Sequence, residues 1–131
     1  MAKRVRLAEL QLAIMNVLWE REEATVAQVR EDLEAANRLL AHTTVATMLS
    51  RMETEAHVKH RSDGRANVYR PILQREDVSR TMVSDLVSRL FAGDVTEMVA
   101  HLLADSEVSP EEISRLKKLV RQKEKEVRDG Q

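Results

Sequence analysis

The apolar residues in the first half of the chain recur at intervals of three and four positions, the period of an α-helix. Residues 7–20 carry a broad apolar stripe, which predicts a buried first helix. A second stripe, Val26, Val29 and Leu33, follows Thr25, which with Gln28 has the spacing of a helix capping box. A third stripe runs through residues 42–55, HTTVATMLSRMETE. We therefore predict three consecutive helices.

The pattern then changes to two short apolar runs with turn residues between them. One run contains Val58, the other ends at Pro71, and Ser62-Asp63-Gly64 lies between them. This arrangement predicts a β-hairpin with Asp-Gly at its tip. Three helices followed by a hairpin are the elements of a winged helix-turn-helix. We therefore predict a mainly α protein in which residues 1–72 form a winged-helix DNA-binding domain.

Helical periodicity returns after residue 72, with one interruption at Gly93-Asp94. Ser109-Pro110-Glu111-Glu112 then supplies an N-cap, an N1 proline and a capping glutamate, the strongest helix start in the sequence. These helices carry more apolar surface than they can cover by folding on themselves, which favours a dimer. The alternative is that they pack only against the winged-helix domain. We expect residues 73–131 to form a helical dimerisation region through Val78, Met82, Leu86, Leu90, Met98, Leu102, Ile113, Leu116 and Val120.

The amino-acid composition of the chain excludes several classes of function. The chain has 131 residues, a net charge of -1 and no cysteine, which excludes disulfides, thiolate metal sites and cysteine nucleophiles. No apolar run approaches the length of a membrane span, and the N-terminus has no apolar leader segment. We expect a cytoplasmic protein without membrane insertion, and any basic surface must be local because the net charge is near zero.

Short hydroxyl side chains are unusual on the outer face of the predicted third helix. At about 100° per residue, Thr43, Thr47, Ser50 and Arg51 lie opposite its apolar side. Thr and Ser are weaker helix formers than the Glu, Lys, Arg and Gln that usually fill solvent-facing positions. They do suit a DNA major groove, because a short side chain lets the helix approach closely and a hydroxyl can bond to base edges. The alternatives are a merely exposed face or one that packs on a partner helix.

The predicted hairpin is basic. Lys59, Arg61, Arg65 and Arg70 against Asp63 give it a net charge of +3. A basic ribbon beside a DNA-reading helix is what contact with phosphates requires. The alternative is a solvated edge hairpin whose charges discourage the addition of another strand.

Metal, cofactor and catalytic sites are not indicated. The four histidines, His42, His57, His60 and His101, lack the spacing and the clustered carboxylates of a metal site. The sequence contains no Gly-rich phosphate loop, no HExxH and no GxSxG. We expect no enzyme activity, no catalytic residues, no bound metal and no cofactor.

Several segments together resemble one family. They are LAELQLAIMNVLWE, ATVAQV, HTTVATMLSRM, DGRANVYRP and the closing VSPEEISRLKKLV, and they resemble the penicillinase and methicillin-resistance repressors (BlaI/MecI), which include CopY-type members. The resemblance implies a homodimer that binds a palindromic operator and represses transcription. It also implies DNA contacts at Thr43, Thr44, Thr47 and Arg51, with Thr44 nearer a backbone phosphate, and a wing around Arg65.

The chain departs from this family at four points. Ala56 stands where members commonly have a glycine, so the third helix is expected to end differently, and His57 replaces a usual leucine. His101-Leu102 aligns with the Asn-Phe pair that is cleaved in drug-responsive members, and the C-terminal cysteine pairs of copper-responsive members are absent. An upstream protease or sensor is therefore not assigned.

These observations lead to one hypothesis and one alternative. The hypothesis is a dimeric, nucleoid-associated repressor that binds double-stranded DNA through its third helix and wing, with Thr43, Thr44, Thr47, Ser50, Arg51, Arg61 and Arg65 as the contact residues. The alternative is a helical adaptor that binds another protein rather than DNA.

Overall fold

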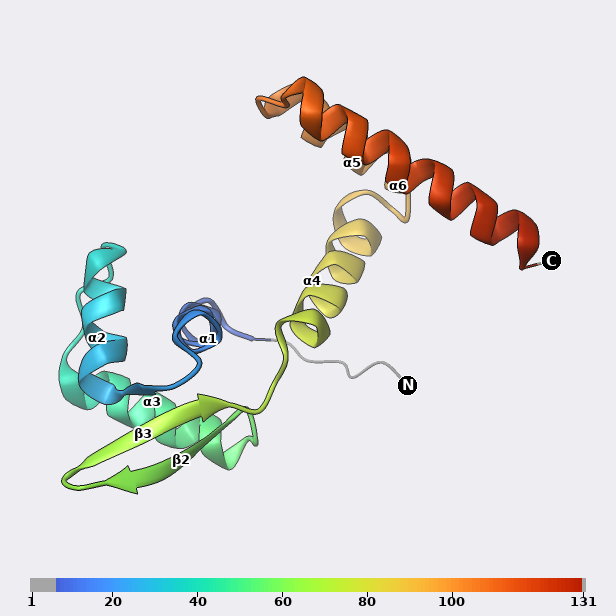
Figure 1. Cartoon of the computed structure of the whole chain (residues 1–131). Coiled ribbons are helices and arrows are strands. Elements are labelled where there is room, and N and C mark those ends of the chain that lie inside the picture. Colours follow the sequence, from blue (N-terminus) through green and yellow to red (C-terminus); the bar gives the residue numbers. More distant parts are fainter. Residues whose placement is uncertain (1–6, 131) are drawn as a thin grey trace. The chain divides into compact units, whose positions relative to one another are not determined.

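The computed structural model describes residues 7–130 of the chain (Figure 1). The elements of the first half are α1 (Glu9–Arg21), β1 (Ala24–Thr25), α2 (Val26–Ala35), α3 (His42–Thr54), β2 (Val58–Asp63) and β3 (Ala66–Pro71). They are followed by α4 (Arg75–Leu90), α5 (Val95–Asp105) and α6 (Pro110–Asp129). The predicted mainly α architecture with three helices and a hairpin wing is confirmed.

Intrachain contacts divide the molecule into two compact units, with the division between Asp85 and Leu86, inside α4. The first unit therefore includes the whole winged-helix region and the beginning of α4. The functional boundary between residues 72 and 73 remains a prediction.

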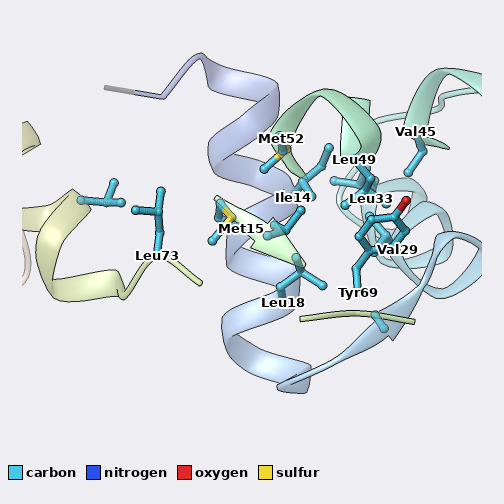
Figure 2. Packing of buried hydrophobic residues seen from close by; sticks show 13 residues of the cluster. Ile14, Met15, Leu18, Val29, Leu33, Val45, Leu49, Met52, Tyr69 and Leu73 are labelled. Atoms are coloured by element: carbon cyan, nitrogen blue, oxygen red, sulfur yellow. The ribbon is translucent and has the colours of Figure 1, made fainter. Parts of the chain in front are cut away.

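The core of the first unit joins the apolar sides of its three helices to the sheet (Figure 2). Each helix contributes the face that its periodicity predicts, and burial of one such leucine contributes about 1.5–3 kcal/mol. The buried residues of the three helices are Ile14, Met15 and Leu18 of α1, Val29 and Leu33 of α2, and Val45, Leu49 and Met52 of α3. The position of α3 is therefore fixed by its inner face, which leaves its outer face available.

Local capping fixes where the helices begin. At α2, the backbone N–H of Gln28 donates to the hydroxyl of Thr25 at 3.2 Å, and the Gln28 side chain accepts from the Thr25 N–H at 2.9 Å. Asp94 caps α5 at 3.0 Å, and Ser109 caps α6 at 3.2 Å. The predicted capping box and the predicted start of the last helix are both confirmed.

The three strands form an antiparallel sheet in the order β1-β3-β2. Asp63 pairs with Ala66, so the two residues of the turn are Gly64 and Arg65, one position later than an Asp-Gly tip. Gly64 has φ +63°, and Arg65 is not among the residues with positive φ, which is the pattern of a type II′ turn. This register places Arg65 at the tip of the wing.

The end of α3 differs from the sequence expectation. Ala56 has φ +64°, its N–H donates to the Glu53 carbonyl, and the His57 N–H donates to the Met52 carbonyl. These two bonds define a Schellman motif, which usually has glycine at the left-handed position. The expectation of a different helix end was wrong, because the backbone keeps the left-handed conformation with alanine in place of glycine.

Replacing Ala56 with glycine should therefore stabilise the protein by about 1 kcal/mol, since glycine adopts positive φ without a steric penalty. Denaturant unfolding measures this change. The control is Ala35→Gly at the exposed end of α2, where φ is helical and glycine should not stabilise. An unchanged or lowered unfolding midpoint for Ala56→Gly would contradict the strain at this position.

The beginning of α4 is tied to α1. The indole N–H of Trp19 donates to the Leu73 carbonyl at 2.8 Å, and the Arg75 guanidinium lies 5.2 Å from the centre of the Trp19 ring. Leu73 and Val78 are 1% exposed and belong to the core of the first unit. No helix in residues 7–130 is long and apolar enough to cross a membrane.

Candidate nucleic-acid interface

The outer face of α3 is exposed and polar. Thr43, Thr47, Ser50 and Arg51 all lie on the surface, opposite the buried apolar side of the helix. Thr44 is exposed beside them. Within the described residues, no hydrogen bond or ion pair occupies the side chains of the three threonines or of Arg51. These groups are therefore available to an external partner.

Four of these residues, with Met48, line a shallow hollow on the surface of α3. They are Thr43, Thr44, Thr47 and Arg51. The N-terminus of the same helix begins after Ala41, which provides no side-chain cap. The positive end of the helix dipole and its free N–H groups favour an anion such as a phosphate there. The hydroxyl row and an electropositive helix end thus lie on one element.

Arg65 lies beside the N-terminal half of α3. It lines a groove with His42 and Ala46 of α3 and with Asn67 and Tyr69 of β3. Like Arg51, it makes no ion pair within the described part of the chain. The structure therefore places the tip of the wing beside α3, and the contact of this wing with phosphates remains a prediction.

Arg61, unlike Arg65, already contacts acidic side chains of the protein. Its guanidinium donates to Glu23 at 2.9 Å and lies 3.8 Å from Asp63. The hydrogen bond to Glu23 is the main reason that the pKa of Arg61 is raised above its ordinary value. The sheet explains this contact, because Arg61 lies opposite Val68 of β3, and Val68 lies opposite Thr25 on the other side. Arg61 is thus already paired inside the protein, a partner that the sequence analysis missed.

The remaining basic residues of the wing repel one another. Lys59 and Arg70 lie directly opposite in the register of β2 and β3, and neither makes an ion pair within residues 7–130. Like charges opposite each other destabilise a strand pair. The charge of Glu53 offsets part of this repulsion at Lys59, and an approaching anion would offset more of it. The wing is therefore electrostatically suited to phosphates.

The helices after residue 85 leave much apolar surface uncovered. No residue of α5 or α6 is buried. The most exposed residue of the predicted dimerisation set is Leu90, whose exposed fraction is 69%. The exposed members of that set are Met82, Leu86, Leu90, Leu102, Leu116 and Val120, whereas Met98 and Ile113 are half-buried.

Val78 must be removed from that set. It is 1% exposed and packs in the core of the first unit, so its side chain cannot reach a second chain. The helical stripe that contains it is continuous, but its first part faces the chain's own core. The sequence pattern does not distinguish these two uses of one stripe.

The pair His101-Leu102 lies on α5, with both side chains exposed. The His101 ring is 5.4 Å from the Phe91 ring, and its Nδ1 lies 3.8 Å from Asp105. No group of three or more potential metal-ligating side chains occurs in the described residues.

Comparison with known proteins decides the family. A sequence model of the penicillinase repressor family matches residues 7–122. The chain belongs to this family. Two Mycobacterium tuberculosis strains have a relative named transcriptional regulator BlaI, 40% identical over 90 residues. The match covers 68% of this chain and 64% of the relative, so the chain matches slightly less than two thirds of the relative's length.

Solved structures agree with the penicillinase repressor fold. The DNA-binding domain of the repressor BlaI has a TM-score of 0.50 and 26% identity, over 59% of this chain and 93% of that domain. A MarR family protein from Bacillus stearothermophilus has a TM-score of 0.50 at 20% identity, over 94% of this chain and 76% of that protein. The second likeness concerns the fold alone. The relatives' names describe a regulator and a repressor, and neither name describes an enzyme.

Proposed function

We propose that this protein is a DNA-binding transcriptional repressor that acts as a homodimer on a palindromic operator. The observation that carries the proposal is the exposed row of Thr43, Thr47 and Arg51 on α3, whose polar groups have no partner among residues 7–130. Arg65 of the wing lies beside His42 and Ala46 of the same helix. A relative named transcriptional regulator and the DNA-binding domain of a repressor support it. The proposal requires no catalytic residue and no cofactor.

In this proposal α3 enters the major groove. Thr43, Thr47 and Ser50 contact base edges or thymine methyl groups, and Arg51 reaches a guanine edge or a phosphate. Thr44, at the flank of the row, contacts a backbone phosphate. Arg65 at the wing tip contacts a phosphate that flanks the bases read by α3. Arg61 contributes only when it leaves Glu23.

Dimerisation in this proposal joins residues 73–131 of two chains. A single chain leaves α5 and α6 without one buried residue, and association covers such an apolar surface favourably. A two-fold dimer presents two copies of the winged-helix domain, residues 1–72, to half-sites about one helical turn apart. Bound at a promoter in the nucleoid of the cytoplasm, it blocks the polymerase.

Two substitutions test this assignment by separating base reading from phosphate contact. Thr47→Val keeps the side-chain shape and removes a hydroxyl, so it should change which sequences are preferred. Arg65→Ala should weaken binding to all sequences similarly and reduce the salt slope by about one. The measurement is binding of each variant to random duplexes and to fragments that the wild type selects from them. Equal effects of Thr47→Val on selected and random DNA would contradict direct reading by Thr47.

Glu23→Gln should strengthen DNA binding. It removes the negative charge of the Arg61 partner at 2.9 Å and leaves only the weaker ion pair with Asp63 at 3.8 Å, so Arg61 can turn to a phosphate more easily. One added phosphate contact steepens the salt slope by roughly 0.9. The control is Glu22→Gln, which removes the same charge from the neighbouring position without touching Arg61. If both variants bind equally tightly, the gain comes from net charge and not from the release of Arg61.

A further inference from the structure

Glu53 and His60 connect the end of α3 to β2. The two carboxylate oxygens of Glu53 lie 2.7 and 2.8 Å from Nδ1 of His60. The same carboxylate accepts the backbone N–H of His60 at 2.9 Å. Both side chains are partly shielded, with exposures of 30% and 35%. One carboxylate therefore holds both the main chain and the ring of a single wing residue.

The position of His60 in the sheet explains why its N–H is available. β2 is an edge strand, because the sheet order is β1-β3-β2. Alternate N–H groups of an edge strand point away from the sheet and lack a strand partner. Glu53 supplies the missing acceptor at His60. The bond thus attaches α3 to the free edge of the wing.

The charge state of Glu53 strengthens this attachment. Partial burial raises the pKa of Glu53, but hydrogen bonds from the His60 backbone and ring, with the nearby charge of Lys59, lower it below its ordinary value. The carboxylate is therefore ionised at neutral pH and can only accept hydrogen bonds, so Nδ1 of His60 carries a proton. Hydrogen bonds to an ionised group are roughly twice as strong as neutral ones.

The ring of His60 also lies close to the core. Its ring centre lies 5.4 Å from that of Tyr69, which is directly opposite in the strand register and is buried. His60 is thus held between the carboxylate at the end of α3 and a core residue of β3. Arg51 precedes Glu53 by two residues in α3. Arg65 lies in the turn at the end of β2, the strand that Glu53 holds through His60.

We propose that Glu53 is a positioning residue for DNA binding, which through His60 fixes the wing relative to α3 so that Arg65 and the α3 hydroxyl row meet the same duplex. This inference rests on the proposed function. A wing fixed before binding loses less conformational freedom when its tip contacts a phosphate. Without the contact between Glu53 and His60, Arg65 still carries its charge but contributes less to the affinity for DNA.

A double-mutant cycle between Glu53→Ala and Arg65→Ala tests this role with the full chain and a fluorescein-labelled duplex of mixed sequence. The two residues belong to different elements and share no contact, so a purely structural role of Glu53 predicts additive effects. Positioning predicts that Arg65→Ala lowers the salt slope by about one in the wild type and much less in Glu53→Ala. The departure from additivity should be at least about twofold in affinity.

Glu55→Ala is the matched control. Glu55 lies at the same end of α3, but it accepts a hydrogen bond from Gln11 of α1 at 3.1 Å instead of holding the wing. Its removal deletes the same charge and should leave the effect of Arg65→Ala intact. Additive effects in the Glu53 cycle, or equal coupling in the Glu55 cycle, would overturn the proposal. His60→Phe gives a second test, because it keeps a ring against Tyr69 and removes the Nδ1 donor.

A measurement without DNA separates this inference from the proposed function. The chain has no cysteine, so spin labels can be attached at Ser50→Cys and Arg65→Cys alone, and an excess of unlabelled protein leaves one labelled chain in each proposed dimer. The distribution of distances between the labels should broaden in Glu53→Ala and in His60→Phe, and stay narrow in Glu55→Ala. Unchanged distributions would overturn the positioning role even if DNA binding is established. Absence of DNA binding by the wild type would overturn the proposed function and leave this result standing.

Discussion

Replacing Leu116 and Val120 with aspartate should convert the protein to monomers and weaken operator binding by about 10²–10⁴-fold, because the second half-site is then no longer held at high effective concentration. The two side chains are 39% and 65% exposed in the single chain and lie on the apolar stripe of α6. A dimer would bury them, and an unpaired carboxylate at such a position strongly opposes association. Sedimentation equilibrium and DNA titration on the same samples measure both consequences.

The control for this prediction uses the opposite face of α6. Ser114→Asp and Gln122→Asp introduce the same two charges about half a helical turn away from Leu116 and Val120. This variant should remain dimeric and should lose affinity only through its added negative charge. A monomeric wild type, or equal dissociation of both double variants, would contradict a dimer formed through the apolar side of α6.

Local signals explain why most elements could be predicted. The apolar sides of α1, α2 and α3 have the helical period, and that side is the one that packs into the core. The starts of α2 and α6 depend on Thr25 and Ser109, whose hydroxyls bond within their own helix. The sequence therefore contains both the periodicity and the start signals needed to place these helices.

Elements that depend on distant partners were not predictable. β1 has two residues, Ala24 and Thr25, which become a strand only because they pair with β3. The left-handed conformation of Ala56 has no local cause, since alanine disfavours it, and it follows from the fixed path of the chain between α3 and β2. In both cases tertiary packing determines a backbone conformation that the local sequence does not favour.

The candidate site was predictable in its residue types but not in its internal pairings. The helical period places Thr47 and Arg51 opposite the core, and their exposure agrees with that prediction. The pairing of Arg61 with Glu23 spans 38 positions and depends on the strand order. Nothing in a charge pattern distinguishes Arg61, which is paired, from Arg65, which makes no ion pair within residues 7–130. The contacts of these residues with DNA remain predictions.

The most direct test of the whole account is the salt dependence of binding to duplex DNA. Arg51, Lys59, Arg65 and Arg70 make no ion pair within the described residues of one subunit, and a dimer presents this set twice. Each phosphate contact contributes about -0.9 to the slope of log affinity against log salt.

If a dimer contacts six or more phosphates through these residues, affinity should fall by orders of magnitude between about 50 and 200 mM salt. Titration of a labelled duplex mixture with the wild-type protein at four salt concentrations measures the slope, and Arg65→Ala should make it shallower. A steep loss of affinity is the predicted result. Binding that is absent, or that does not change with salt, would contradict DNA recognition and favour an adaptor that binds another protein.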